Sequence, residues 1–209
     1  MRYHSGFDLE AVVGAALDEL NDSDPEALKI ILLAATCGLR RAEIDALGWE
    51  AFNFARLILH IEPNEHFQPK SEDSIGSIDL EARVAEFFQR LKAKAMGSFV
   101  VQSELRPKAT NATYASYRCQ TIFERVTRWL RKHGVRGEKP LHQLRKEFGS
   151  RICDRYGIYA SSRMLRHGDV ATTAAHYLDK KATTTVGLEH LFASPTPGTH
   201  HPEASGVSA

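Results

Sequence analysis

Apolar residues recur three and four positions apart through most of this chain, which is the spacing of helices that bury one face. The first such stretch runs from Phe7 to Leu20, with Asp8 as its expected N-cap. A second begins at Pro25 after the cap Asp24 and is apolar nearly all round, so we expect it to be buried. The same reading predicts helices over Arg41–Leu47, Glu81–Met96, Tyr114–His133, His142–Tyr156 and Ala160–Arg166, and a short last helix capped by Asp169.

Extended segments are few. Branched residues over Leu57–Ile61 and a second short stretch, Ser77–Leu80, flank a polar segment that contains prolines and Gly76. This arrangement predicts a hairpin or small sheet with an elaborated turn. Ser98–Gln102 is a further strand candidate, and Ser103–Thr113 is expected to be a loop. The fold class predicted is therefore mainly α with a small antiparallel β-sheet, an α+β domain.

The 209 residues suffice for one sizeable domain, which we place at residues 1–193, followed by a disordered Pro-, Gly- and Ser-rich tail at 194–209. No run of about 18 apolar residues occurs, and the N-terminus lacks an apolar stretch of signal-peptide type. We expect a cytoplasmic protein without a membrane partner. The three cysteines are far apart, which predicts reduced thiols rather than disulfides or a metal site.

The net charge of +1 conceals an uneven distribution. Residues 1–40 carry seven acidic and three basic side chains, whereas residues 118–151 carry ten basic and three acidic ones. A polyanion, if one binds, is expected to bind the second region. Four basic residues there follow one face of the predicted 114–133 helix and are candidates for contacts with a DNA backbone: Arg118, Arg125, Arg128 and Lys132. An alternative for this face is simple solvation.

The stretch from Leu141 to Lys181 carries the clearest chemistry. His142 and Arg145 lie three residues apart and so share a helix face, and His167 and Tyr177 follow. A guanidinium fork, imidazole donors and a phenol suit a phosphodiester under attack by an oxygen nucleophile.

This stretch resembles the tyrosine recombinase (phage integrase) family, whose catalytic domain carries His-x-x-Arg, a later His and a nucleophilic Tyr. The segment Thr36–Ile44 resembles the arginine box of that family, with Arg40 in the catalytic place. The segment Gln68–Asp73 resembles its β-hairpin turn and nominates Lys70. The resemblance extends over about residues 25–190 and implies the tyrosine recombinase catalytic-domain fold.

The resemblance implies a set of roles. Arg40, Arg145, His142 and His167 would stabilise the charge of the transition state, Tyr177 would attack the phosphorus, and Lys70 would protonate the leaving 5′-oxygen. Glu43 would support an arginine by ion pairing. No cofactor or metal is needed, because the phosphotyrosine bond retains the energy for rejoining. The DNA partner would be double-stranded, with four protomers on paired sites and a monomer in its absence.

Three positions depart from the commonest family pattern. Lys146-Glu147 follow Arg145 where many members have His-Thr, Arg166 stands where Gly usually precedes the third His, and Tyr177 lies ten rather than nine positions after His167. The N-terminal core-binding domain of the family is not visible in the sequence, so we interpret the chain as a fragment. Residues 183–192 are candidates for the C-terminal segment that protomers exchange.

Alternatives remain at this point. A type IB topoisomerase would share the same residues, and the chain could be a catalytically silent DNA-binding module. Lys70 can be a solvated turn lysine, His142 a helix cap and His167 a core histidine. A metal site of His142, His167 and His176 is disfavoured, since matching carboxylates are lacking and the arginines would repel a cation.

Overall fold

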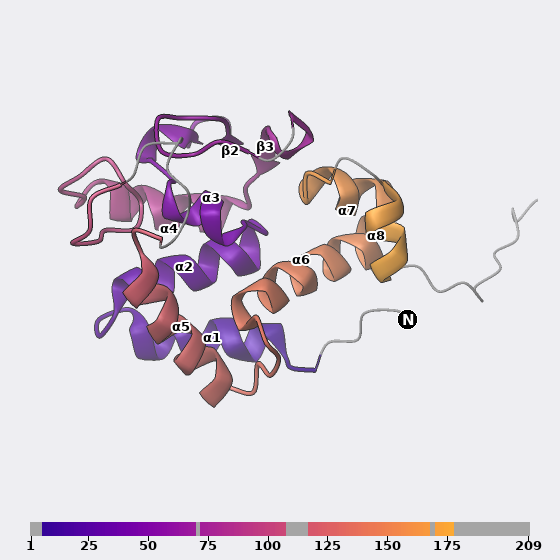
Figure 1. Ribbon diagram of the computed structural model, residues 1–209, viewed down its shortest axis with the longest axis horizontal. Helices are drawn as coiled ribbons and strands as arrows, with labels where there is room; N and C mark the ends of the chain where they lie inside the picture. The colour runs from indigo at the N-terminus through magenta and orange to yellow at the C-terminus, as the bar shows by residue number, and fades with distance from the viewer. Residues whose placement is uncertain (1–5, 70–71, 108–116, 168–169, 178–209) are drawn as a thin grey trace, which may run out of the picture. The chain divides into compact units, whose positions relative to one another are not determined.

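The computed structural model describes residues 6–69, 72–107, 117–167 and 170–177; for Asp73, Thr172 and residues 175–177 the backbone alone is described. All of these residues lie in one compact unit, Met1–Leu178. The unit is mainly helical with one three-stranded sheet, as predicted (Figure 1). The predicted boundary at residue 193, the tail and the segment 183–192 lie outside the described residues and stay predictions.

The first two helices begin where their caps predict. In α1 (Leu9–Leu20), the Asp8 carboxylate accepts the N–H groups of Glu10 and Ala11. In α2 (Pro25–Thr36), Asp24 accepts the N–H of Ala27, and Pro25 occupies the first turn. These carboxylates satisfy backbone donors that a helix start leaves unpaired.

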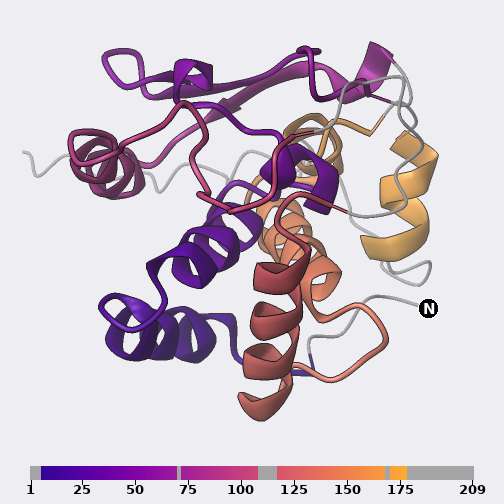
Figure 2. The ribbon, with the colours of Figure 1, turned by 60° about the vertical axis from the view of Figure 1, so that its left-hand side comes forward.

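Helix α2 is the centre of the core. It packs against α1, α5 (Gln120–Lys132) and α6 (Pro140–Tyr156), and Ile30, Ile31 and Leu33 along it are fully buried. In both views of the ribbon the sheet lies on one side of α2 and α1 lies on the other (Figures 1 and 2). The apolar run predicted to be buried is therefore the element around which the other helices pack.

The sheet has the order β1-β2-β3 with antiparallel pairs. It comprises β1 (Phe52–Asn53), β2 (Ile58–Ile61) and β3 (Gly76–Asp79). The short helices α3 (Arg41–Asp45) and η1 (Trp49–Ala51) precede it, η2 (Glu72–Ser74) lies between β2 and β3, and α4 (Ala82–Lys92) follows. The β2–β3 hairpin is thus confirmed, whereas the two-residue β1 was not predicted because so short a segment has no periodicity.

Two predicted elements are wrong. Ser98–Gln102 forms only an isolated bridge, Gly48 to Phe99, although its backbone bonds to Leu47 and Trp49. Helix α5 begins at Gln120 rather than Tyr114, because buried Asp45 accepts the N–H groups of Arg118 and Cys119 and so caps it. Both outcomes depend on contacts with residues more than 40 positions away.

The C-terminal part of the described chain is three helices. Helix α6 packs on α7 (Ile158–Met164), which packs on α8 (Val170–Tyr177). The Ser161 hydroxyl donates to the Gly149 carbonyl at 2.8 Å, which fixes the close approach of α6 and α7. No helix of the described residues is both long and apolar enough to cross a membrane.

Candidate active site

Arg40 lies just before α3 and is held by Glu43 in the first turn of that helix. Its Nη1 donates to Glu43 Oε1 at 2.8 Å, and its backbone N–H donates to Oε2 at 2.7 Å. The Arg40 side chain remains 34% exposed, whereas that of Glu43 is 1% exposed. The buried carboxylate therefore holds both the backbone and the guanidinium of Arg40, while about a third of the Arg40 side chain stays exposed.

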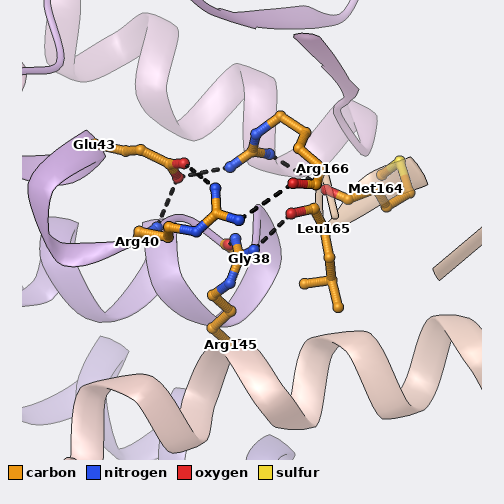
Figure 3. A network of polar contacts seen from close by, with 7 residues as sticks. All are labelled: Gly38, Arg40, Glu43, Arg145, Met164, Leu165 and Arg166. Carbon is orange, nitrogen blue, oxygen red and sulfur yellow. Dashed lines mark hydrogen bonds and ion pairs between the residues drawn. The ribbon is translucent and has the colours of Figure 1, made fainter. Parts of the chain in front are cut away.

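Arg145 approaches from α6 and is almost fully buried. Its guanidinium donates from Nη1 to the carbonyl oxygen of Gly38 and from Nη2 to that of Leu165, the latter at 2.5 Å. These carbonyls belong to the turn after α2 and the turn after α7. Arg145 thus links three segments that are distant in sequence (Figure 3).

Gly38 is required where it stands. Its φ of 61° is a left-handed backbone conformation that residues other than glycine rarely adopt. A Cβ at this position would also lie 2.5 Å from Cδ1 of the Phe148 ring. The close packing of this turn on α6 brings the Gly38 carbonyl within reach of Arg145.

The turn after α7 contains Leu165, Arg166 and His167. Arg166 has φ 51° although it carries a side chain, a conformation that disfavours L-residues by about 1–2 kcal/mol. Its carbonyl oxygen accepts Arg40 Nη2 at 3.2 Å, while the preceding carbonyl accepts Arg145. Its own guanidinium donates from Nη2 to Glu43 Oε2 at 2.6 Å, and both side chains are buried. The turn therefore contacts both predicted catalytic arginines.

The two predicted histidines lie beside this cluster in different settings. Desolvation, followed by the positive charges of Lys146, Arg145 and further cations, lowers the pKa of His142 to about 4. The ring is therefore neutral at pH 7. His167 shares a 2.8 Å hydrogen bond between Nδ1 and the hydroxyl of buried Thr173 on α8, and the Ser162 carbonyl accepts its backbone N–H. It is oriented by α7 and α8 together.

Lys70 and the side chain of Tyr177 lie outside the described residues. The backbone of Tyr177 ends α8, the helix that also orients His167. The hairpin nominated for Lys70 is formed by β2 and β3 on either side of the undescribed positions. Their roles as nucleophile and acid stay predictions, and the described part of the site is a cluster of Arg40, Arg145, His142 and His167.

A cluster of this kind suits an anion. Three arginines surround one buried carboxylate, and the group as a whole is positively charged. Burial alone would raise the pKa of Glu43, but the charges of Arg166 and Arg145 and the donors of Arg40 hold it below its usual value. Among the described residues no group of three or more His, Cys, Asp or Glu side chains is placed to hold a metal ion.

Arg118 is a correction to the expected DNA-binding face. It is 6% exposed, and its guanidinium donates to the carbonyl oxygens of Asp45 and Val101 and lies over the Phe99 ring at 4.1 Å. It joins the start of α5 to α3 and to the segment after α4. Its side chain is therefore structural and is not available to a ligand.

The other three predicted basic residues lie on the exposed side of α5. Arg125 is paired with Asp24 at 2.7 Å. Arg128 lines a depression of about 330 Å³ with Arg41 and Arg131, neither of which the sequence reading singled out for this face, and Lys132 follows at the end of the helix. Arg41 also lies over the rings of Tyr117 and Phe123. The depression therefore gathers three arginines and one acidic residue, Glu124.

The sequence also did not predict that the 165–167 turn contacts both arginines of the site. Arg166 was noted only as a departure from a glycine, and nothing in the local sequence indicates that it contacts Glu43, 123 positions away. The one available signal was a bulky cation at a position that a motif usually fills with glycine. Nor does the local sequence around Gly38 indicate that its carbonyl is a contact of Arg145.

No protein-family model matches the sequence, and no curated protein matches it. Solved structures do match its fold. The Tn1549 transposon integrase (residues 82–397) in complex with circular intermediate DNA has a TM-score of 0.59 at 16% identity, over 88% of this chain and 63% of that one. XerA recombinase has a TM-score of 0.60 at 16% identity, over 92% of this chain and 65% of that one.

A lambda integrase dimer bound to a COC′ core site has a TM-score of 0.56 at 14% identity, over 86% of this chain and 49% of that one. The chain therefore has the fold of the tyrosine recombinase catalytic domain, as the motifs predicted. It spans less than two thirds of the length of each of these three structures.

Proposed function

We propose that this chain is the catalytic domain of a site-specific DNA recombinase or integrase that cleaves and rejoins strands through a 3′-phosphotyrosine bond. The observation that carries the proposal is the meeting of Arg40 and Arg145 at one turn. They come from segments 105 positions apart; Arg145 donates to the carbonyl of Leu165, and Arg40 donates to the carbonyl of the next residue, Arg166. The shared fold with recombinases supports the same conclusion.

The reaction we propose is an in-line displacement at phosphorus. The Tyr177 phenol oxygen forms the new bond to phosphorus as the bond to the 5′-oxygen breaks, and the phenol proton passes to solvent water. The leaving oxygen takes a proton from Lys70. Negative charge gathers on the non-bridging oxygens, and the exposed part of Arg40, with His142 and His167, would stabilise it more strongly than the ground state.

The neutral state of His142 has a consequence for its role. With a pKa of about 4 it does not add a charge at pH 7, so in the absence of DNA it acts as a hydrogen-bond donor or acceptor. A bound phosphate would favour its protonated form, because an opposite charge within a few ångströms raises the pKa of an imidazole. His142 would then become cationic only when substrate is present.

Double-stranded DNA is the partner we propose. The Tn1549 and lambda integrases with the same fold were solved with DNA, and the depression lined by Arg41, Arg128 and Arg131 offers cations to a phosphate backbone. Assembly of four protomers on paired sites is part of the proposal. A chain truncated after Lys181 that elutes like the full chain in size exclusion, with and without DNA, would count against exchange of residues 183–192.

The test of the chemistry is a covalent adduct. The substrate is a pool of duplexes of random sequence, each with a nick. Cleavage near the nick releases a short fragment with a 5′-hydroxyl, which diffuses away, so the strand cannot be rejoined and the protein stays bound to the DNA. We expect the wild type to form an adduct that survives denaturing electrophoresis and Tyr177→Phe to form none. Tyr159→Phe, an exposed tyrosine on α7, is the matched control and should leave the adduct yield unchanged.

Lys70 is tested with a second substrate. Lys70→Ala should lose most cleavage, and a 5′-thiol leaving group should restore it, because a thiolate leaves without a proton donor. A variant that stays inactive on the thiol substrate would contradict the acid role. An adduct that persists in Tyr177→Phe would contradict the nucleophile, and plasmid relaxation without joined products would favour a topoisomerase.

A further inference from the structure

Arg166 is a buried cation in an unfavourable backbone conformation. Its φ of 51° is one that glycine adopts without strain, yet the side chain is present and is 2% exposed. Such a conformation persists when surrounding contacts hold it. The contacts in question are the bond from Nη2 to Glu43 and the bond from Nη1 to the Met164 carbonyl at 3.2 Å.

Glu43 stands between two arginines and accepts from both. Oε1 accepts Arg40 Nη1, and Oε2 accepts the Arg40 backbone N–H and Arg166 Nη2 (Figure 3). One negative charge is thus shared by two cations. The shorter side-chain bond, 2.6 Å against 2.8 Å, is the one to Arg166, and this pair is buried on both sides, where Coulomb attraction is strongest.

This sharing changes what Arg40 can do. If Glu43 had Arg40 as its only cation, the carboxylate would cancel most of the positive charge of Arg40 at the point where an anion approaches. With Arg166 opposing the same carboxylate from the buried side, the cluster keeps a positive charge, and Arg40 is the partly exposed member that can present it. Glu43 then acts mainly as a geometric support.

We infer that Arg166 is a positioning residue, which offsets the charge of Glu43 and so leaves Arg40 available to a phosphate oxygen of the DNA. It acts through Glu43 and through its own carbonyl, which accepts Arg40 Nη2. The identity of the anion rests on the proposed function, whereas the buried pair of Arg166 and Glu43 is seen directly in the structure.

The pair is tested first without any DNA. The melting temperatures of the wild type, Arg166→Met, Glu43→Gln and the double variant form a double-mutant cycle, which measures how strongly the two side chains are coupled. We expect each single variant to melt several degrees lower, and the double variant to melt no lower than the worse single one, because removing one partner leaves an unpaired buried charge. Arg163→Met, which changes an exposed arginine of α7 three residues before Arg166, has the same loss of charge and should melt like the wild type.

Inorganic phosphate gives a second reading that needs no activity. At constant ionic strength phosphate should raise the melting temperature of the wild type and of Arg163→Met, but raise that of Arg166→Met less. An equal rise in all three proteins would overturn the link between Arg166 and Arg40, as would a cycle in which the two single effects simply add.

The third reading uses the duplex recovered from the covalent adduct. Arg166→Met should cleave it about tenfold more slowly or worse, with the affinity for DNA changed much less. Arg166→Lys should recover most of the rate, since a lysine ammonium can still reach one carboxylate. On a duplex with a neutral methylphosphonate at the cleaved position the loss should shrink, because the charge that Arg40 meets is gone.

The outcomes separate the two proposals. If the wild type forms no adduct, the proposed function fails, and the melting cycle together with the phosphate shift alone decides whether Arg166 acts on Arg40. If the adduct forms but Arg166→Met cleaves as fast as the wild type, or loses equal rate on both substrates, Arg166 is only a structural residue and the inference is overturned.

Discussion

The guanidinium of Arg145 donates to the carbonyl oxygen of Leu165 at 2.5 Å, and this bond joins α6 to the turn that precedes His167. The other Nη of the same side chain donates to Gly38. One side chain of 3% exposure therefore holds together the turn that precedes Arg40 and the turn that contains His167. The guanidinium that the sequence predicts to be catalytic is therefore also a structural link.

Arg145→Lys should destabilise the fold although it keeps the charge. A single ammonium cannot reproduce a planar fork that donates to two carbonyls in different segments, and each hydrogen bond to a charged group contributes about 1.5–3 kcal/mol. Urea unfolding should show a loss in that range. Exposed Arg155→Lys on the same helix is the control, and equal stability of the two variants would contradict the assignment.

Gly38→Ala should be strongly destabilising. The positive φ disfavours alanine by about 1–2 kcal/mol, and the new methyl group would collide with the Phe148 ring, which adds about 1–3 kcal/mol of overpacking. The control is Gly14→Ala in α1, where nothing lies within 4 Å of a new Cβ. That variant should be more stable by about 0.5–1 kcal/mol. Urea midpoints that move the same way in both variants would be inconsistent with this reading.

Asp45→Ala should loosen the start of α5. The buried carboxylate accepts the N–H groups of Arg118 and Cys119 at 3.0 and 2.7 Å, and buried donors left without a partner cost about 1–3 kcal/mol. Amide exchange at residues 118–122 should speed up more than elsewhere. Asp8→Ala removes an exposed cap and should cost only about 1 kcal/mol; uniform exchange across the helices in Asp45→Ala would argue against a local cap.

Stability should fall on acidification from pH 6.5 towards pH 4. The pKa of His142 is lowered to about 4 from its ordinary 6.5, so the unfolded chain binds more protons in this window and stability rises with pH across it. Glu43, with its lowered pKa, adds a loss of the same sign at the acid end, since its contribution is present above its ordinary pKa and disappears below it. His142→Gln should flatten the melting temperature between pH 4 and 6.5, and an unchanged slope would contradict this prediction.

The salt dependence of DNA binding should separate the exposed arginines from the buried one. Under the proposed function, Arg128→Gln should lower the slope of log affinity against log salt by about 1, as expected for one lost phosphate contact. Arg118→Gln should instead lower the melting temperature, with the slope retained in the folded protein. Fluorescence anisotropy with a fixed duplex measures both slopes. A reduced slope for folded Arg118→Gln would indicate that Arg118 contacts the DNA after all.

The sequence alone determined the helix starts at Asp8 and Asp24, the buried run of α2, the β2–β3 hairpin and the motifs that bring Arg40 and Arg145 into one site. These depend on local chemistry, since a cap acts within three residues and a buried helix shows its apolar character in its own composition. Tertiary structure decided that α5 begins at Gln120, that Arg118 is buried and that Arg166 opposes Glu43. Each of those depends on a partner between 73 and 123 positions away. The sequence near a charged residue does not indicate whether folding will expose its side chain to water or pair it with a buried carboxylate.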